Sequence, residues 1–143
     1  MNHIKLLLVD DEKPFLDTLT KRLEKREINI SAVYSGKDAL AELEKNKTID
    51  VVILDVKMPG MDGIQTLVEI KKSFPLVEVI MLTGHATVET AIDGMKLGAF
   101  DYLMKPCDID VLIDKAREAL EKKRKHEEKI MDARMKEITD RMI

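Results

Sequence analysis

The sequence predicts an α/β fold, a doubly wound five-stranded parallel sheet followed by an extended C-terminal helix. Two observations indicate this class. Short apolar runs rich in β-branched residues alternate five times with longer segments of helical periodicity. Polar residues follow four of these runs at the point where each run ends. Strands that alternate with helices form βαβ units, whose right-handed crossovers restrict the topology to a doubly wound sandwich.

The first half of the chain holds two strand–helix pairs and a central strand. We predict strands over residues 4–9 and 28–34. The first helix covers 14–26, where Leu and Phe residues recur on one helical face and a proline occupies the first turn. The second helix begins at Ser35-Gly36. The run 49–54 is nearly continuous in apolar residues, as expected for a central strand buried on both faces.

The second half of the chain continues the same alternation after a turn-rich segment. Met, Pro, Gly and Asp residues fill that segment, and each later element follows its predecessor after a short loop. The predicted elements are the turn over 58–63, a helix over 64–71, a strand over 77–82, a helix over 86–97, a strand over 100–104 and a helix over 109–120.

The predicted organisation is a domain over 1–120 and a helical extension or linker over 121–143. The run EKKRKHEEK at 121–129 interrupts the apolar stripe of the last helix. Apolar residues then return at the 4-3-4 spacing of a heptad seam, namely Met131, Met135, Ile138 and Met142. The segment is either a solvated continuation of the helix, or a linker that pairs between two chains or leads into an output domain.

Composition excludes several classes of protein. The formal net charge of −3 argues against bulk electrostatic binding, so we expect no direct contact with nucleic acid. The single cysteine, Cys107, excludes an intrachain disulfide and a multi-cysteine metal site. No apolar run approaches the ~20 residues that span a bilayer, and the first residues lack a signal-peptide layout. We therefore expect a soluble cytoplasmic protein with no membrane partner.

Four polar signals follow predicted strands: Asp10-Asp11, Asp55, Thr83 and Lys105. The carboxyl ends of parallel strands meet at one edge of the sheet, where ligands bind in such folds, so these side chains should converge. Mg²⁺ usually takes one or two carboxylates, waters and phosphate oxygens. Asp11 and Asp55 are candidate direct ligands, and Asp10 is a candidate partner of a metal-bound water. Alone, Asp10-Asp11 would equally suit the acidic first turn of a helix, but Asp55 favours a metal site.

Asp55 is also the candidate nucleophile. It ends a strand too apolar to finish in a charge without cause, and a carboxylate can attack a phosphoryl group to form an acyl phosphate. Lys105 can place a positive charge against the phosphoryl oxygens, and Thr83 can donate a hydroxyl hydrogen bond to them. Singly, a strand-end Thr or Lys is more often structural. Together, these residues predict a phosphorylation-controlled switch.

Four motifs around these residues resemble the receiver domain of bacterial two-component response regulators. They are VDDE at 9–12, LDVKMPGMDG at 54–63, TGHA at 83–86 and KP at 105–106. The resemblance runs in order from residue 4 to about residue 120. It implies a receiver fold with strand order 2-1-3-4-5.

The resemblance also assigns the acceptor and the metal site. It implies that Asp55 accepts a phosphoryl group from a sensor histidine kinase. It implies that Mg²⁺, or Mn²⁺ in its place, is held by Asp10, Asp11, Asp55 and the backbone carbonyl of Lys57. A receiver of this kind is a regulatory phosphoacceptor rather than an enzyme.

Three further residues receive roles from the resemblance. Thr83 and Lys105 would contact the phosphoryl group. Tyr102 matches an aromatic switch residue that moves with Thr83 and changes the surface formed by the fourth helix, fifth strand and fifth helix. The bond before Pro106 would be cis. Residues 83–106 most resemble receivers of enhancer-binding transcription activators, which implies control of transcription.

Lys57 and His85 flank Asp55 and Thr83 in the sequence. Their side chains are therefore candidates for controlling the access of water to the acyl phosphate and hence its lifetime. We expect substitutions at Lys57 or His85 to alter the rate of dephosphorylation.

Two other protein classes share parts of this pattern. A haloacid-dehalogenase-type phosphohydrolase needs D-x-D after the first strand, where this chain reads Asp10-Asp11-Glu12. A flavodoxin-like electron carrier needs a hydroxyl- and glycine-rich loop at the same place. Fold alone does not assign function. The residues after the first strand differ from both requirements and exclude both classes. The chain is either a single-domain regulator or a receiver from a longer activator, and a homodimer through the fifth helix and its extension is a candidate assembly.

Overall fold

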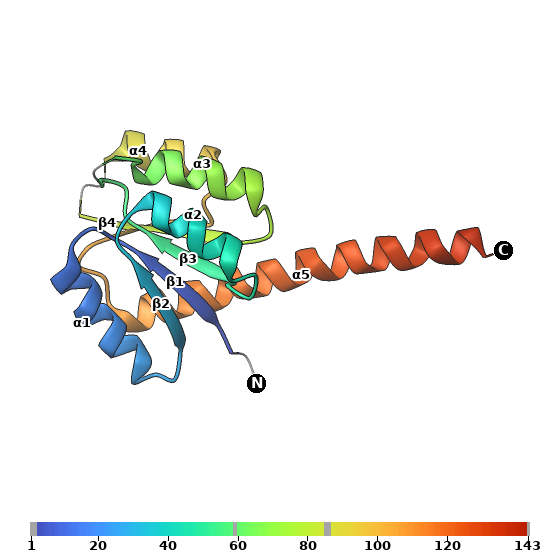
Figure 1. Ribbon diagram of the computed structural model, residues 1–143, viewed down its shortest axis with the longest axis horizontal. Helices are drawn as coiled ribbons and strands as arrows, with labels where there is room; N and C mark the ends of the chain where they lie inside the picture. Colours follow the sequence, from blue (N-terminus) through green and yellow to red (C-terminus); the bar gives the residue numbers. More distant parts are fainter. Residues whose placement is uncertain (1–2, 59, 85–86, 143) are drawn as a thin grey trace.

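The computed structural model describes residues 3–58, 60–84 and 87–142 and confirms the predicted topology (Figure 1). Five parallel strands form one sheet in the order β2-β1-β3-β4-β5. In chain order the elements are β1 (Lys5–Val9), α1 (Lys13–Glu24), β2 (Asn29–Val33), α2 (Gly36–Lys45), β3 (Val51–Leu54), α3 (Gly63–Ser73), β4 (Glu78–Thr83), α4 (Val88–Lys96), β5 (Asp101–Met104) and α5 (Ile109–Arg141).

Helices cover both faces of the sheet (Figure 1). On one face, buried residues of α1 and α5 such as Leu16 and Leu112 pack against Leu8, Ile53 and Ile80 of the strands. On the other face, α2 and α3 cover the alternate residues of the same strands, and α4 lies on this side of the sheet beside β5 (Figure 1). All residues of β3 and β4 are buried, because these strands lie inside the sheet between the two helical layers.

The strand register brings the ends of the strands together. The amide of Asp55 donates to the carbonyl of Val9 at 2.9 Å, which places Asp55 beside the end of β1. The amide of Lys105 donates to the carbonyl of Thr83 at 2.9 Å, which does the same for β4 and β5. The predicted site residues therefore lie along one edge of the sheet.

The last helix, α5, covers part of the sheet and then extends beyond it. α5 is continuous over 33 residues and extends well beyond the sheet as a single rod (Figure 1). At the amino-terminal edge of the sheet, Lys123 Nζ lies 2.8 Å from Asp50 Oδ1 and Lys122 Nζ lies 3.6 Å from Glu78 Oε2. These ion pairs tie α5 to the sheet just before the extension leaves it. Within the described residues, no helix is long and apolar enough to cross a membrane.

Element boundaries differ slightly from those predicted. α1 ends at Glu24 rather than at residue 26, because the chain turns there and Glu27 adopts a φ of 60°. β2 loses one residue at each predicted end, and β5 begins at Asp101 rather than at residue 100. The predicted start of the fourth helix, Ala86, lies outside the described residues, and α4 is described from Val88.

Candidate functional site

Three carboxylates form the centre of the site. One oxygen each from Asp10, Asp11 and Asp55 lies within 4.8 Å of the others. Asp10 and Asp55 are buried, whereas Asp11 is exposed. Burying two like charges so close together is costly unless an opposite charge joins them. The cluster therefore favours a bound cation.

The turn after β3 fixes the position of Asp55. Gly63, the first residue of α3, donates its amide to the carbonyl of Val56 at 2.7 Å. A Cβ atom at Gly63 would collide with the carbonyl oxygen of Asp55, so only glycine allows this close approach. Asp62 and Gln65 form a capping box that fixes the start of the helix. The backbone behind the candidate acceptor is thus held by α3.

One oxygen of the Asp55 side chain has no hydrogen-bond partner among the described residues. Asp55 is 2% exposed, and its Oδ1 atom has no hydrogen-bond partner within the described part of the chain. Buried carboxylate oxygens are normally satisfied, and an exception calls for an explanation such as a missing ion or a reactive role. This oxygen is suited to bind a cation or to attack an electrophile.

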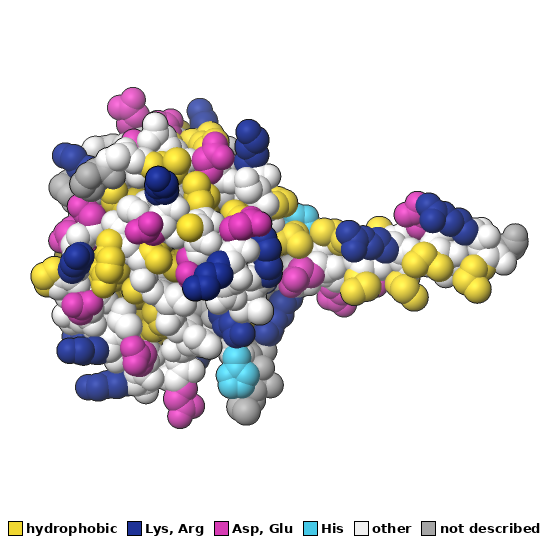
Figure 2. All heavy atoms as spheres, viewed as in Figure 1, with side chains coloured by type: hydrophobic (Ala, Val, Ile, Leu, Met, Phe, Trp, Pro, Cys, Tyr) yellow, Lys and Arg dark blue, Asp and Glu magenta, His cyan; other side chains and the backbone are white. Residues whose placement is uncertain are grey.

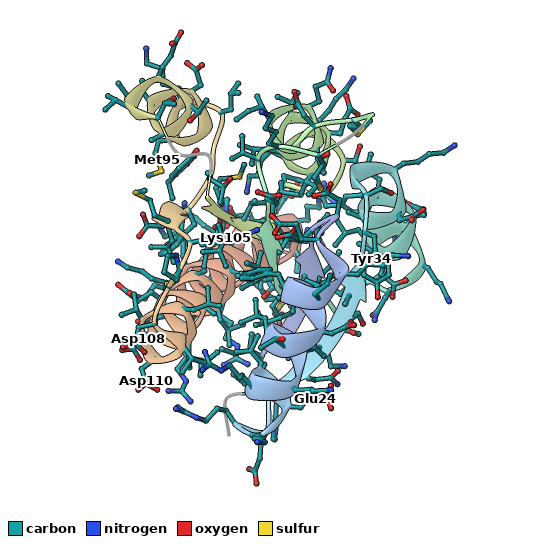
Figure 3. All side chains as sticks on the ribbon, turned by 90° about the vertical axis from the view of Figure 1, so that its left-hand side faces the viewer. Glu24, Tyr34, Met95, Lys105, Asp108 and Asp110 are labelled. Atoms are coloured by element: carbon teal, nitrogen blue, oxygen red, sulfur yellow. The ribbon has the colours of Figure 1, made fainter. Side chains whose placement is uncertain are left out.

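Lys105 supplies the positive charge of the site. Its Nζ atom lies 2.6 Å from Asp10 Oδ2 and 3.3 Å from Glu12 Oε1. Figure 3 shows Lys105 near the N-terminal end of α1, with Glu24 at the opposite end of that helix. Burial would lower the pKa of Lys105, but the hydrogen bond to Asp10 and the charges of Asp10, Asp55 and Glu12 outweigh it and raise the pKa. Lys105 is therefore a permanent cation beside the carboxylates.

Asp10 experiences the opposite balance. Burial, together with the nearby charge of Asp55, raises the pKa of Asp10 above its ordinary value of 3.8. Hydrogen bonds from Lys105 and from the amide of Glu12 oppose this effect and do not cancel it. The anionic form of Asp10 thus still gains from an additional cation.

Thr83 and Tyr102 link the site to α4 and β5. Thr83 is fully buried at the end of β4. Tyr102 is partly buried on the neighbouring strand β5, where it pairs with Met81 in the register. Its hydroxyl lies 2.9 Å from Thr90 Oγ1, at the start of α4. Tyr102 therefore contacts the first turn of α4, the helix that follows β4 in the sequence.

The remaining predicted residues have different outcomes. Lys57 is exposed two residues after Asp55. His85 lies outside the described residues, so its predicted role stays a prediction. The Lys105–Pro106 peptide bond is cis, the conformation implied by the resemblance.

Sequence reasoning missed several residues of the site. The motif at 9–12 contains Glu12 but indicates no role for it, and periodicity indicates only that Phe15 lies on an apolar helical face. The Phe15 ring in fact lies beneath Lys105 Nζ, at 4.1 Å from the ring centroid. For Thr90, the sequence shows only the Thr-x-x-Thr spacing, which is typical of a side-chain cap at the start of a helix. Such contacts depend on side-chain reach between elements, which periodicity does not encode.

The residues present fit a magnesium ion. Mg²⁺ prefers oxygen ligands and keeps several waters, so it requires few protein groups. Asp11 offers an exposed carboxylate, and Asp55 offers the unpartnered oxygen described above. Asp10 is engaged by Lys105 and suits a contact through water better than a direct one. The donor set is thus that of a hard cation.

Comparison with known proteins agrees with this geometry. Residues 6–117 match the response regulator receiver domain family. The transcriptional regulatory protein ZraR of Salmonella typhimurium is 42% identical over 117 residues, which cover 82% of this chain and 26% of that protein. The DNA-binding transcriptional regulator NtrC of Klebsiella pneumoniae is 38% identical over 112 residues, which cover 76% of this chain and 24% of that protein. The chain thus spans about a quarter of the length of these curated relatives.

Solved structures show the same fold. A response regulator receiver domain protein from Clostridium thermocellum superposes with a TM-score of 0.80 at 38% identity, covering 85% of this chain and 97% of that one. The receiver domain of NtrX from Brucella abortus superposes with a TM-score of 0.75 at 35% identity, covering 81% of this chain and 98% of that one. With the sheet order and the matched residues 6–117, these findings show that the chain belongs to the response regulator receiver domains, the regulatory domains of two-component systems.

Proposed function

We propose that the chain is a switch in which Asp55 accepts a phosphoryl group from a sensor histidine kinase in a Mg²⁺-dependent reaction. The observation that carries this proposal is the buried, unpartnered Oδ1 atom of Asp55 beside two other carboxylates and a lysine. An acid buried in this way is costly for the fold alone, but it suits a nucleophile that meets a cation and a phosphoryl group.

The transfer needs no proton. A carboxylate oxygen of Asp55 forms a bond to phosphorus, and the bond from phosphorus to the donor atom breaks with its electron pair leaving on the donor. Asp55 becomes an acyl phosphate. The protein contributes position and charge, since phosphoryl transfer asks for little other covalent chemistry.

Each surrounding residue has a part in this step. Asp11, Asp55 and the backbone carbonyl of Lys57 would hold Mg²⁺, with Asp10 acting through water. When bound, Mg²⁺, or Mn²⁺ in its place, would neutralise charge on the phosphoryl oxygens. Lys105 would bind one phosphoryl oxygen as a point charge. Thr83, buried at the end of β4, would donate its hydroxyl to another.

The output of the switch would be a change of surface. Movement of Thr83 toward a phosphoryl group would alter the space available to Tyr102 and so the surface made by α4, β5 and α5. This is a two-state element biased by a new charge. The curated relatives are described as transcriptional regulators, so we propose that this surface serves to control transcription.

The extension over 121–143 would act as a linker beyond a receiver domain over 1–120. Its exposed apolar seam, Met131, Met135, Ile138 and Met142, lies along one side of the rod (Figure 2). We propose that two chains pair through α5 and this seam.

The test of the acceptor is intact mass after incubation with Mg²⁺ and acetyl phosphate, for the wild-type chain and for Asp55→Asn. We expect one phosphoryl group on the wild type and none on the variant, and no adduct without Mg²⁺. If neither protein gains mass, and transfer from histidine kinases fails as well, the chain is not a phosphoacceptor.

A further inference from the structure

The ammonium group of Lys105 has three close neighbours from one short segment. Asp10 lies at 2.6 Å, Glu12 at 3.3 Å and the centroid of the Phe15 ring at 4.1 Å. Asp10 belongs to the carboxylate cluster, whereas Glu12 does not. Glu12 is therefore an anionic partner of Lys105 with no place among the candidate metal ligands.

The position of Glu12 in the helix supports a role outside the helix itself. Glu12 is the N-cap residue of α1, but its side chain caps no amide. In contrast, α2, α3, α4 and α5 all begin with a side-chain cap, from Ser35, Asp62, Thr87 and Asp108. Short side chains cap helices well because they reach back to the first turn. The longer Glu12 side chain instead reaches across to Lys105, the residue after β5.

We propose that Glu12 competes with the incoming phosphoryl group for Lys105 and so slows the phosphorylation of Asp55. This inference rests on the function proposed above. A phosphoryl group on Asp55 needs the Lys105 ammonium, and a cation bound at the carboxylates would satisfy Asp10 but not Glu12. Glu12 is thus a positioning residue that acts through Lys105.

The strength of the contact suits a moderating role rather than a block. The Glu12 side chain is 56% exposed, whereas that of Lys105 is 12% exposed. Ion pairs with one partner in water are weak and exchange readily. Phe15 and Asp10 would keep Lys105 near the site after Glu12 has released it. Removal of Glu12 should therefore quicken the transfer without displacing the lysine.

The experiment measures the rate of phosphoryl adduct formation by intact mass, with acetyl phosphate and Mg²⁺, on the full chain. We expect Glu12→Gln to react about two- to fivefold faster than wild type, the range given by a weak exposed ion pair. Glu24→Gln, which removes the same charge at the far end of α1, should react at the wild-type rate (Figure 3).

Two further measurements separate this role from simple repulsion of the donor. In a Lys105→Ala background, Glu12→Gln should give no gain, whereas a persisting gain would show that Glu12 repels the donor and would overturn the proposal. Without donor, the NMR signals of the Lys105 side chain should move in Glu12→Gln and stay in Glu24→Gln. Unmoved signals, or equal rates for wild type and Glu12→Gln with adduct on both, would contradict the role of Glu12 alone. No adduct on the wild type would contradict the proposed function and this role together.

Discussion

At the scale of single residues, the candidate acceptor Asp55 combines deep burial with nearby like charges. Its buried Oδ1 atom lacks a partner in the described residues, and two carboxylates lie close by. We predict that Asp55→Asn is more stable than wild type by about 1–3 kcal/mol without Mg²⁺, because it removes a buried charge beside two other carboxylates while Lys105 is already paired with Asp10 and Glu12. Urea unfolding in a chelating buffer measures the difference.

Mg²⁺ should reduce the difference in stability between Asp55→Asn and the wild type. A ligand of the folded state stabilises it by an amount that grows with the logarithm of its affinity, so Mg²⁺ should stabilise the wild type more than Asp55→Asn and narrow the difference in stability between them. Asp17→Asn, which removes an exposed acid from α1, serves as the control and should leave stability unchanged. A variant less stable than wild type in the chelating buffer would mean that Asp55 is stabilised by contacts other than those described.

The sequence predicted the residues of the site better than their contacts. Asp10, Asp11, Asp55 and Lys105 could be placed together because each follows a strand, and the ends of parallel strands must meet. The pairing of Glu12 and Phe15 with Lys105 could not be placed this way. It depends on the angle at which α1 leaves β1, which no local pattern fixes.

At the scale of elements, a contact between the Thr90 and Tyr102 side chains joins the start of α4 to β5. Thr90 Oγ1 lies 3.0 Å from Thr87 Oγ1 in the capping box of α4, and 2.9 Å from the hydroxyl of Tyr102. A movement of Tyr102 therefore disturbs the cap of α4. This contact is a direct physical link between the proposed switch residue and the surface proposed to change.

We predict that Thr90→Val and Tyr102→Phe are not additive. Each removes the same hydrogen bond, so the double variant should lose about 0.5–1.5 kcal/mol less stability than the sum of the two single losses. Urea unfolding of the four proteins gives the coupling. Ser35→Ala, which removes the side-chain cap of α2 and has no part in the Thr90–Tyr102 contact, should instead be additive with Tyr102→Phe. Additivity in both cycles would show that the Thr90–Tyr102 bond contributes nothing.

Sequence patterns predict the elements better than they predict where each element ends. The type and order of all ten elements follow from periodicity, but the end of α1 does not. Lys25 and Arg26 are as suitable for a helix as the residues before them. The chain leaves the helix there because β2 must begin beside β1, and the turn at Glu27 with a φ of 60° makes this possible.

At the scale of the whole molecule, the extension of α5 is fixed to the domain but not covered by it. Lys123 is buried against Asp50, and Lys122 reaches the buried Glu78. Beyond them, nearly every residue from 124 to 142 is exposed. A single exposed helix of this kind is marginal in water, and most helical stability in proteins comes from packing of an apolar face. The exposed seam therefore favours a second helix against it.

We predict that the seam makes the chain dimerise, and that Met135→Gln with Ile138→Gln weakens the dimer at least tenfold. Both side chains lie on the exposed seam, and the loss of two apolar contacts from so short an interface leaves little to hold it (Figure 2). Lys136→Gln, on another side of the same helix, is the matched control and should dimerise like the wild type. Sedimentation equilibrium before and after phosphorylation measures each dissociation constant. A wild-type chain that stays monomeric in both states would contradict pairing through the seam.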